Sequence, residues 1–209
     1  MIIDYTHPRY QTENKRNGAY FYAYEIKKNI IPKIKTDRNW VLLNINGIAA
    51  DHSIVFIHNN LNPERYSWLS AYDDLILICG IPETCEKVKH LGTAIYLPLS
   101  VDVEYVRQFR RKKDKDAVFA GRKDKVNLGR LPEGIDYLFD LPRHMLLHEL
   151  ARYRTAFTVG RTAIEAKILD CEIGIYDNRF PTDRWDILDN ADAAKILQLR
   201  LNEIDGVKK

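Results

Sequence analysis

The sequence predicts an α/β protein built from two small Rossmann-like domains, each with a parallel sheet, and completed by a closing C-terminal helix. Two observations support this prediction. Short apolar runs alternate along the chain with segments of helical periodicity, which is the order of parallel strands joined by crossover helices. The runs are continuously apolar, as is typical of strands covered on both faces. The length of 209 residues suits one large domain or two small ones.

Five apolar runs in the first half of the chain are predicted as strands. They are residues 1–4, 40–45, 53–58, 74–79 and 93–99. Segments with helical features lie between them. Residues 18–31, GAYFYAYEIKKNII, carry aromatic and aliphatic side chains at helical spacing. Residues 82–92, PETCEKVKHLG, begin with a proline and end with a glycine, as helices and their C-terminal caps do.

A run of basic residues, RQFRRKKDK at 107–115, interrupts this alternation. We take it as the boundary between a first domain at residues 1–112 and a second at residues 113–188. The alternative is that the run is one solvated face of a single domain. After it the pattern restarts with the strand-like AVFAG, a helix at 142–153, the strand-like TAFTVG, a second helix and the strand-like EIGIYD. Residues 189–209 are predicted to form the closing amphipathic helix.

The composition is that of an ordinary globular protein, with 45% hydrophobic and 29% charged residues. A net charge of +3 does not require a nucleic-acid partner. The three cysteines have no metal-ligand spacing, which suits buried reduced thiols. No leader-like segment and no apolar run long enough to span a bilayer occurs, so we expect a cytoplasmic protein without a membrane span.

Open parallel sheets bind ligands beyond the carboxyl ends of their strands. Three predicted strands end in residues suited to this. His58 follows one strand of the first half, and two cationic turns follow strands of the second half. The candidate residues of those turns are Arg122, Lys125, Gly160, Arg161 and Thr162. Arginine forks, lysine ammonium groups and a helix N-terminus suit a diphosphate. The glycine patterns of dinucleotide-binding folds and P-loops are absent.

Glu165 has two interpretations. Thr162 and Glu165 have the spacing of a capping box, in which both side chains satisfy N–H groups of the first helical turn. Alternatively, the Glu165 carboxylate accepts hydrogen bonds from the hydroxyl groups of a ribose whose phosphates lie at the turn. Spacing alone leaves both interpretations open.

The segment GRTAIEAKILDCEIGIYD resembles the glutamate–alanine segment of GT-B glycosyltransferases. The resemblance implies that Glu165 holds the ribose of a nucleotide-sugar, and that two domains face each other across a cleft. AVFAGRKDK resembles the turn whose cations, here Arg122 and Lys125, hold the diphosphate in that family. YLPLSVDVEYVRQF is similar to the segment that closes the family's N-terminal domain.

Two further segments resemble the acceptor side of the same family. IVFIHNN is similar to the strand that ends in a histidine facing the cleft, which implies a catalytic role for His58. KRNGAYFYAYEI places Gly18 where the family has a glycine turn opening its first helix. We expect His58 either to orient the sugar or to act as a general base toward the acceptor.

The resemblance implies a glycosyltransferase that moves a sugar from a nucleotide-diphosphate donor to an unidentified acceptor. It requires no metal and no further cofactor, and His144 and His148, although four residues apart, have no third ligand nearby. Two features differ from the family: the second half is short, and Phe157 replaces an acidic residue of many retaining members. These features leave open a GT-B-like protein that binds a nucleotide or partner without catalysis.

A third interpretation is a glycosyltransferase that modifies nucleic acid, with the 107–115 run contacting phosphates. The sequence does not identify the donor sugar, the base, the acceptor, the stereochemical outcome or the oligomeric state.

Overall fold

The computed structural model is an α/β protein with two sheets, and every strand pairing described in them is parallel. The α/β class with parallel sheets is therefore confirmed. The structure describes residues 1–4, 18–42, 47–58, 62–121, 123, 131–139, 141–177 and 186–206.

The chain forms two compact units. The first consists of Met1–His7, Ala23–Pro98 and Ala191–Lys209, and the second of Pro8–Tyr22 and Leu99–Asn190. This division differs from the predicted one at three places. The change of unit falls after Pro98, so the basic run lies within the second unit. The closing helix belongs to the first unit, and the start of the first long helix belongs to the second.

The first unit contains a five-stranded sheet in the order β1-β2-β3-β4-β5. Its strands are β1 (Ile2–Asp4), β2 (Asn39–Leu42), β3 (Ser53–Ile57), β4 (Leu75–Cys79) and β5 (Thr93–Tyr96). All five residues of both β3 and β4 are buried, which explains why these strands are continuously apolar in sequence. Each described strand of this sheet is added beside the one before it in the chain, so the strand order shows no switch from one side of the sheet to the other.

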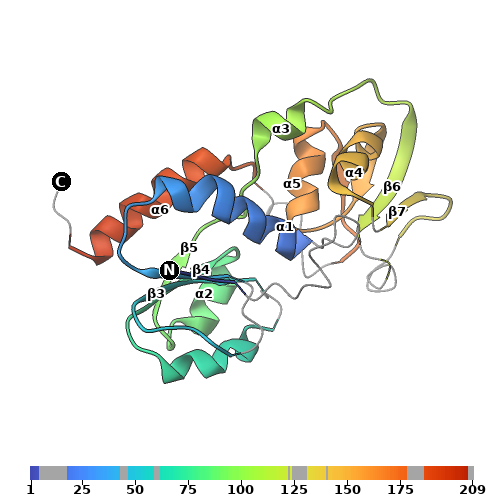
Figure 1. The fold of residues 1–209 in the computed structure, drawn as a ribbon. Helices are drawn as coiled ribbons and strands as arrows, with labels where there is room; N and C mark the ends of the chain where they lie inside the picture. The colour runs from blue at the N-terminus through green and yellow to red at the C-terminus, as the bar shows by residue number, and fades with distance from the viewer. Residues whose placement is uncertain are drawn as a thin grey trace. The chain divides into compact units, whose positions relative to one another are not determined.

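Helical segments cover both faces of the first sheet. They are the end of α1 (Gly18–Glu25) from Ala23 on, which continues as the π-helix η3 (Ile26–Ile30) and the 3-10 turn η4 (Ile31–Lys33), and then η5 (Pro63–Ala71), α2 (Pro82–Val88) and α6 (Asn190–Ile204). Residues of η5 and α2 pack with one face of β2, β3 and β4. Figure 1 shows α6 on the other face of this sheet. The helix expected from Pro82 does begin there, with the proline in its first turn.

The second unit contains a four-stranded sheet in the order β7-β6-β8-β9. Its strands are β6 (Lys115–Gly121), β7 (Asp136–Phe139), β8 (Tyr153–Phe157) and β9 (Glu172–Gly174). The chain starts at the inner strand β6, adds β7 on one side, and then crosses to add β8 and β9 on the other. This is the strand order of doubly wound folds, and the reversal lies between β6 and β8.

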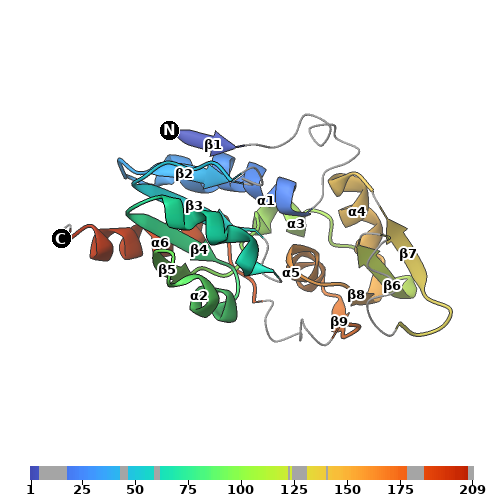
Figure 2. The ribbon, with the colours of Figure 1, turned by 90° about the horizontal axis from the view of Figure 1, so that it is seen from below.

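Three helices pack on one face of this second sheet (Figure 2). They are α3 (Val103–Arg107), α4 (Arg143–Leu150) and α5 (Arg161–Ile168). Val118 and Ala120 of β6 and Ala156 of β8 share a core with the inner side chains of these helices. The opposite face is aromatic, with the Phe119 ring in contact with Tyr137 and Tyr176. Both α4 and α5 follow strands, so both begin at the carboxyl edge of the sheet.

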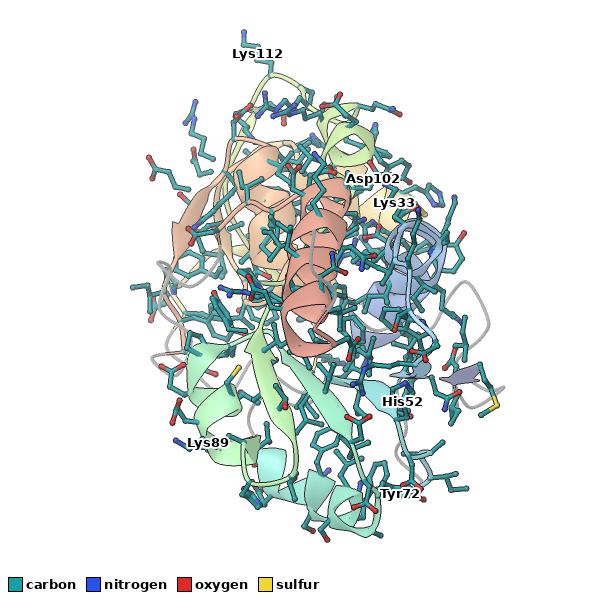
Figure 3. All side chains as sticks on the ribbon, turned by 90° about the vertical axis from the view of Figure 1, so that its left-hand side faces the viewer. Lys33, His52, Tyr72, Lys89, Asp102 and Lys112 are labelled. Carbon is teal, nitrogen blue, oxygen red and sulfur yellow. The ribbon has the colours of Figure 1, made fainter. Side chains whose placement is uncertain are left out.

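The basic run at 107–115 stabilises the C-terminus of α5. Arg110 Nε donates a hydrogen bond of 2.6 Å to the carbonyl of Ile168, and Lys113 Nζ donates one of 2.5 Å to that of Leu169. Cations at this position satisfy the last carbonyls of a helix and oppose the negative end of its dipole. Lys112, by contrast, extends away from the ribbon (Figure 3). Part of the run therefore serves the packing of the second unit.

No helix in the described part of the chain combines the length and the apolar character that crossing a membrane requires.

A charged network joins the amino-terminal ends of β2, β3 and β4 in the first unit. His52 Nδ1 lies 2.5 Å from Asp74 Oδ2, and His52 Nε2 lies 3.1 Å from Asp37 Oδ1. Arg38 pairs with the other Asp74 oxygen and with Asp205, which follows α6. Hydrogen bonds to Asp74 and Asp37 raise the pKa of His52, and the bond to His52 lowers the pKa of both carboxyls.

This network predicts a pH-dependent stability. The pKa of His52 is higher in the folded protein than its usual value of about 6.5. The stabilisation by protonated His52 is therefore complete below about pH 6.5 and is lost as the pH rises through the pKa of the folded state. The effect of the two lowered carboxyl pKa values is present above about 3.8 and is lost in more acidic solution. We expect the melting temperature of the parent to fall between pH 6 and pH 8 more than that of His52→Asn, as thermal denaturation will show. If the melting temperatures of the parent and of His52→Asn change by the same amount between pH 6 and pH 8, His52 does not form these ion pairs in solution.

Candidate functional site

The carboxyl ends of β6 and β8 lie side by side in the second unit. Phe119 of β6 is paired with Phe157 of β8, so Gly121 at the end of β6 and the turn at Gly160 after β8 lie at the same edge of the sheet, on neighbouring strands. The connection after β6 leads to one side and the connection after β8 to the other, which opens a crevice in doubly wound folds. The topology thus brings the carboxyl ends of β6 and β8 together at the one strand reversal described.

Gly160 is the N-cap of α5, with φ of +65° and ψ of −140°. Essentially only glycine adopts this conformation without strain. A Cβ atom at Gly160 would meet none of the described residues within 4 Å, so among these it is the backbone conformation and not a close neighbour that requires glycine. The first N–H groups of a helix have no partner within the helix, so this turn presents donors of α5.

The capping-box interpretation of Thr162 and Glu165 is wrong. That interpretation makes Thr162 the N-cap, but the N-cap of α5 is Gly160, so the helix begins at Arg161, two residues earlier, and its N-cap makes no side-chain hydrogen bond. The left-handed turn at Gly160 starts the helix early, so Thr162 is its second residue. Glu165 then lies beyond the first turn and does not cap it.

Glu165 instead holds two arginines. Arg161 Nε donates a hydrogen bond of 2.7 Å to Glu165 Oε1, and Arg143 NH1 lies 3.0 Å from the same oxygen. Arg161 and Glu165 are buried and Arg143 is partly buried, with side-chain exposed fractions of 6% for Arg161, 4% for Glu165 and 12% for Arg143. A carboxylate that joins two guanidinium groups in a buried place fixes both of them.

The two arginines also share an aromatic partner. The Cζ atom of Arg143 lies 4.0 Å from the centre of the Phe21 ring, and that of Arg161 lies 4.7 Å from it. Tyr105 of α3 approaches Arg143 from another direction, with its ring centre 5.8 Å away. Guanidinium groups bind aromatic faces favourably, more so when water is excluded. These residues, Phe21, Arg143, Arg161 and Glu165, are called the arginine cluster below.

The arginine cluster lies where positive charge is unfavourable for the helices themselves. Arg143 is the first residue of α4 and Arg161 the first residue of α5, and neither helix has an acidic residue in its first turn. Helix N-termini carry a partial positive charge and favour acidic residues. The two arginines of the cluster and the N-termini of α4 and α5 therefore concentrate positive potential at the carboxyl edge of the sheet.

Thr158 adds a polar group to the same turn. Its residue is 2% exposed, and its Oγ1 atom has no hydrogen-bond partner among the residues that the structure describes. A buried hydroxyl without a partner is costly. Thr158 lies two residues before Gly160, in the segment that joins β8 to α5.

His58 lies in the first unit, directly after β3. Its backbone N–H donates to the Tyr66 hydroxyl at 3.0 Å. Burial lowers the pKa of His58 to about 4, against an opposing effect of the Asp4 carboxylate. With this pKa, the His58 ring is neutral at pH 7 and only weakly basic. An effective general base has a pKa near the working pH, and that of His58 lies well below it. This environment favours an orienting role for His58 over proton abstraction.

The remaining predicted site residues lie at the start of α5, at the start of α1 or outside the described part of the chain. Gly160, Arg161, Thr162 and Glu165 all lie in the first two turns of α5 or directly before it. Gly18 is the first residue of α1. Arg122 and Lys125 lie outside the described residues.

Sequence reasoning missed Arg143 and Phe21. Arg143 had one usable signal, an arginine directly after Pro142 at the start of a predicted helix without an acidic first turn. Phe21 had none, because its contact with the arginines joins segments more than a hundred residues apart.

Comparisons of the chain with models of protein families, with curated proteins and with solved structures found no match. The geometry of the second unit is therefore the basis for a functional proposal.

Proposed function

We propose that this protein is a GT-B-like glycosyltransferase that binds the diphosphate of a nucleotide-sugar at the carboxyl ends of β6 and β8. The observation that carries the proposal is the pairing of these two strands, which brings the Gly121 and Gly160 turns to one edge. Departure of a nucleoside diphosphate builds negative charge on phosphate oxygens. The N-terminus of α5 and the nearby cations stabilise that charge without a metal ion.

The resemblance assigns Glu165 to the ribose, and its ion pairs support a second role. Its Oε1 atom is already bonded to Arg161 and Arg143, so the carboxylate keeps these two cations at the edge of the sheet. The proposed acceptor-side role of His58 becomes that of a neutral hydrogen-bonding group, given its lowered pKa of about 4.

One observation favours binding without catalysis as the second candidate. Phe157 stands where many retaining members have an acidic residue, and its ring lies over Gly174, where an added Cβ would come within 2.4 Å of a ring carbon. This packing keeps the position apolar. The nucleic-acid alternative has no comparable support, since Arg110 and Lys113 bond to carbonyls at the end of α5.

Calorimetry with a nucleoside diphosphate tests the proposed donor site. We expect Arg122→Ala to weaken binding about 10-fold or more, because a charged hydrogen bond contributes about 1.5–3 kcal/mol. Lys112→Ala is the control, since this exposed lysine lies on the basic run. Equal affinity of Arg122→Ala and the parent would reject the site. Release of nucleoside diphosphate from a panel of labelled nucleotide-sugars then separates transferase from binder.

A further inference from the structure

The arginine cluster has a feature that stability alone does not explain. Two helices of one unit each begin with an arginine, and both arginines approach one carboxylate oxygen. Two guanidinium groups at such short distance repel each other, and the N-terminal dipoles of α4 and α5 add to the unfavourable potential. Aliphatic residues at these positions would pack without this electrostatic cost.

We propose that Arg143 and Arg161 form one paired anion-binding element that selects a diphosphate over a single phosphate, and that Glu165 is its positioning residue. This inference rests on the proposed function, since the diphosphate is that of the proposed donor. It adds Arg143, for which neither the sequence pattern nor the family resemblance gives a role, and it develops the second role of Glu165, the support of the two arginines.

The geometry gives each residue its part. Arg161 directly follows Gly160, so its guanidinium stem starts at the open turn. Arg143 comes from the preceding helix, α4, and Glu165 Oε1 lies 2.7 Å from Arg161 Nε and 3.0 Å from Arg143 NH1. The Phe21 ring lies 4.0 Å and 4.7 Å from the two guanidinium carbons and limits how far either can turn. Two cations held in this way match a ligand whose charges are divided between two phosphate groups.

A second observation at the same turn points to a ligand independently of the arginines. Thr158 is buried, and its Oγ1 atom has no partner among the described residues. Phosphate oxygens accept hydrogen bonds from hydroxyl groups, so a phosphate within reach of this hydroxyl, which lies two residues before Gly160, would satisfy it.

The test compares inorganic pyrophosphate with inorganic phosphate in calorimetry. We expect the parent to bind pyrophosphate about 10-fold or more tightly than phosphate, as one further charged contact implies. Arg143→Gln should remove most of this preference, and Arg143→Lys should keep part of it, because lysine retains the charge but not the planar fork. Thermal denaturation establishes that each variant is folded at the temperature of the measurement.

Glu165→Gln separates positioning from direct binding. Glutamine has nearly the same shape but cannot hold two guanidinium groups through charge, so the pyrophosphate preference should fall although no group of the proposed anion site is removed. Arg38→Gln is the matched control, since Arg38 is a buried arginine with carboxylate partners in the first unit. It should lose stability and keep the preference.

Three results would overturn the inference: no preference for pyrophosphate in the parent, an unchanged preference in folded Arg143→Gln, or an unchanged preference in folded Glu165→Gln. The same experiments can reject the arginine pair and the transferase activity separately. Pyrophosphate selectivity without turnover of any nucleotide-sugar would keep the paired arginines and remove the transferase. Turnover that is the same in the parent and in Arg143→Gln would remove the arginine pair alone.

Discussion

Replacing Glu165 by alanine is expected to lower the free energy of unfolding by about 3–5 kcal/mol, as loss of one member of a buried ion pair does. Glu165 is 4% exposed in its side chain and bonds to both Arg143 and Arg161. Without it, two buried guanidinium groups lose a shared counter-charge and repel each other. Urea denaturation of the parent and of Glu165→Ala measures the difference.

A surface ion pair provides the control for this prediction. Asp116 pairs with Arg154 at 2.8 Å, with both side chains largely exposed. Its replacement by alanine should cost less than about 1 kcal/mol. A double variant, Glu165→Ala with Arg143→Ala, should lose less than the sum of the two single losses, because the first change has already broken the contact. A loss for Glu165→Ala as small as that for Asp116→Ala would show that the ion pairs do not form in solution.

Gly160→Ala is expected to lower the free energy of unfolding by about 1–3 kcal/mol and to weaken pyrophosphate binding. The φ of +65° and ψ of −140° at this residue are strained for any side chain, although a Cβ would meet no neighbour. Relief of the strain moves the turn, and with it the first N–H groups of α5. Urea denaturation and calorimetry measure the two effects on the same variant.

Gly206→Ala is the matched control for the turn. Gly206 also has a positive φ, of +68°, and a Cβ there would also meet nothing within 4 Å, but it follows α6 in the first unit. It should lose stability and retain the affinity of the parent for pyrophosphate. If folded Gly160→Ala binds pyrophosphate as tightly as Gly206→Ala does, the turn is not part of the anion site.

Two of the strands that the sequence predicted show most clearly why they were visible. β3 and β4 are buried along their whole length, and burial on both faces leaves a continuous apolar run that is visible in sequence. The strand β7 was missed because two of its four residues are exposed and its sequence, DYLF, gives no such run. The short helix α3 was missed for a related reason, since five residues are too few to show helical periodicity.

The candidate site divides in the same way. Gly160, Arg161 and Thr162 could be placed because a strand, a glycine and a helix follow one another locally, and parallel sheets bind ligands at that kind of turn. The unit boundaries could not be placed from the basic run, because Arg110 and Lys113 bond to carbonyls about 56–58 residues away in the chain. A run of charged residues in a sequence does not show which distant groups its side chains contact in the folded protein.

By itself, the sequence determined that the chain forms parallel strands joined by helices, because local periodicity and continuous apolar runs reflect burial that each segment must achieve. Only the tertiary structure decided that β8 lies beside β6, that α6 belongs to the first unit, and that Glu165 joins Arg143 and Arg161. These are contacts between distant segments. They depend on which surfaces meet when the chain closes, and no local pattern of residues records that choice.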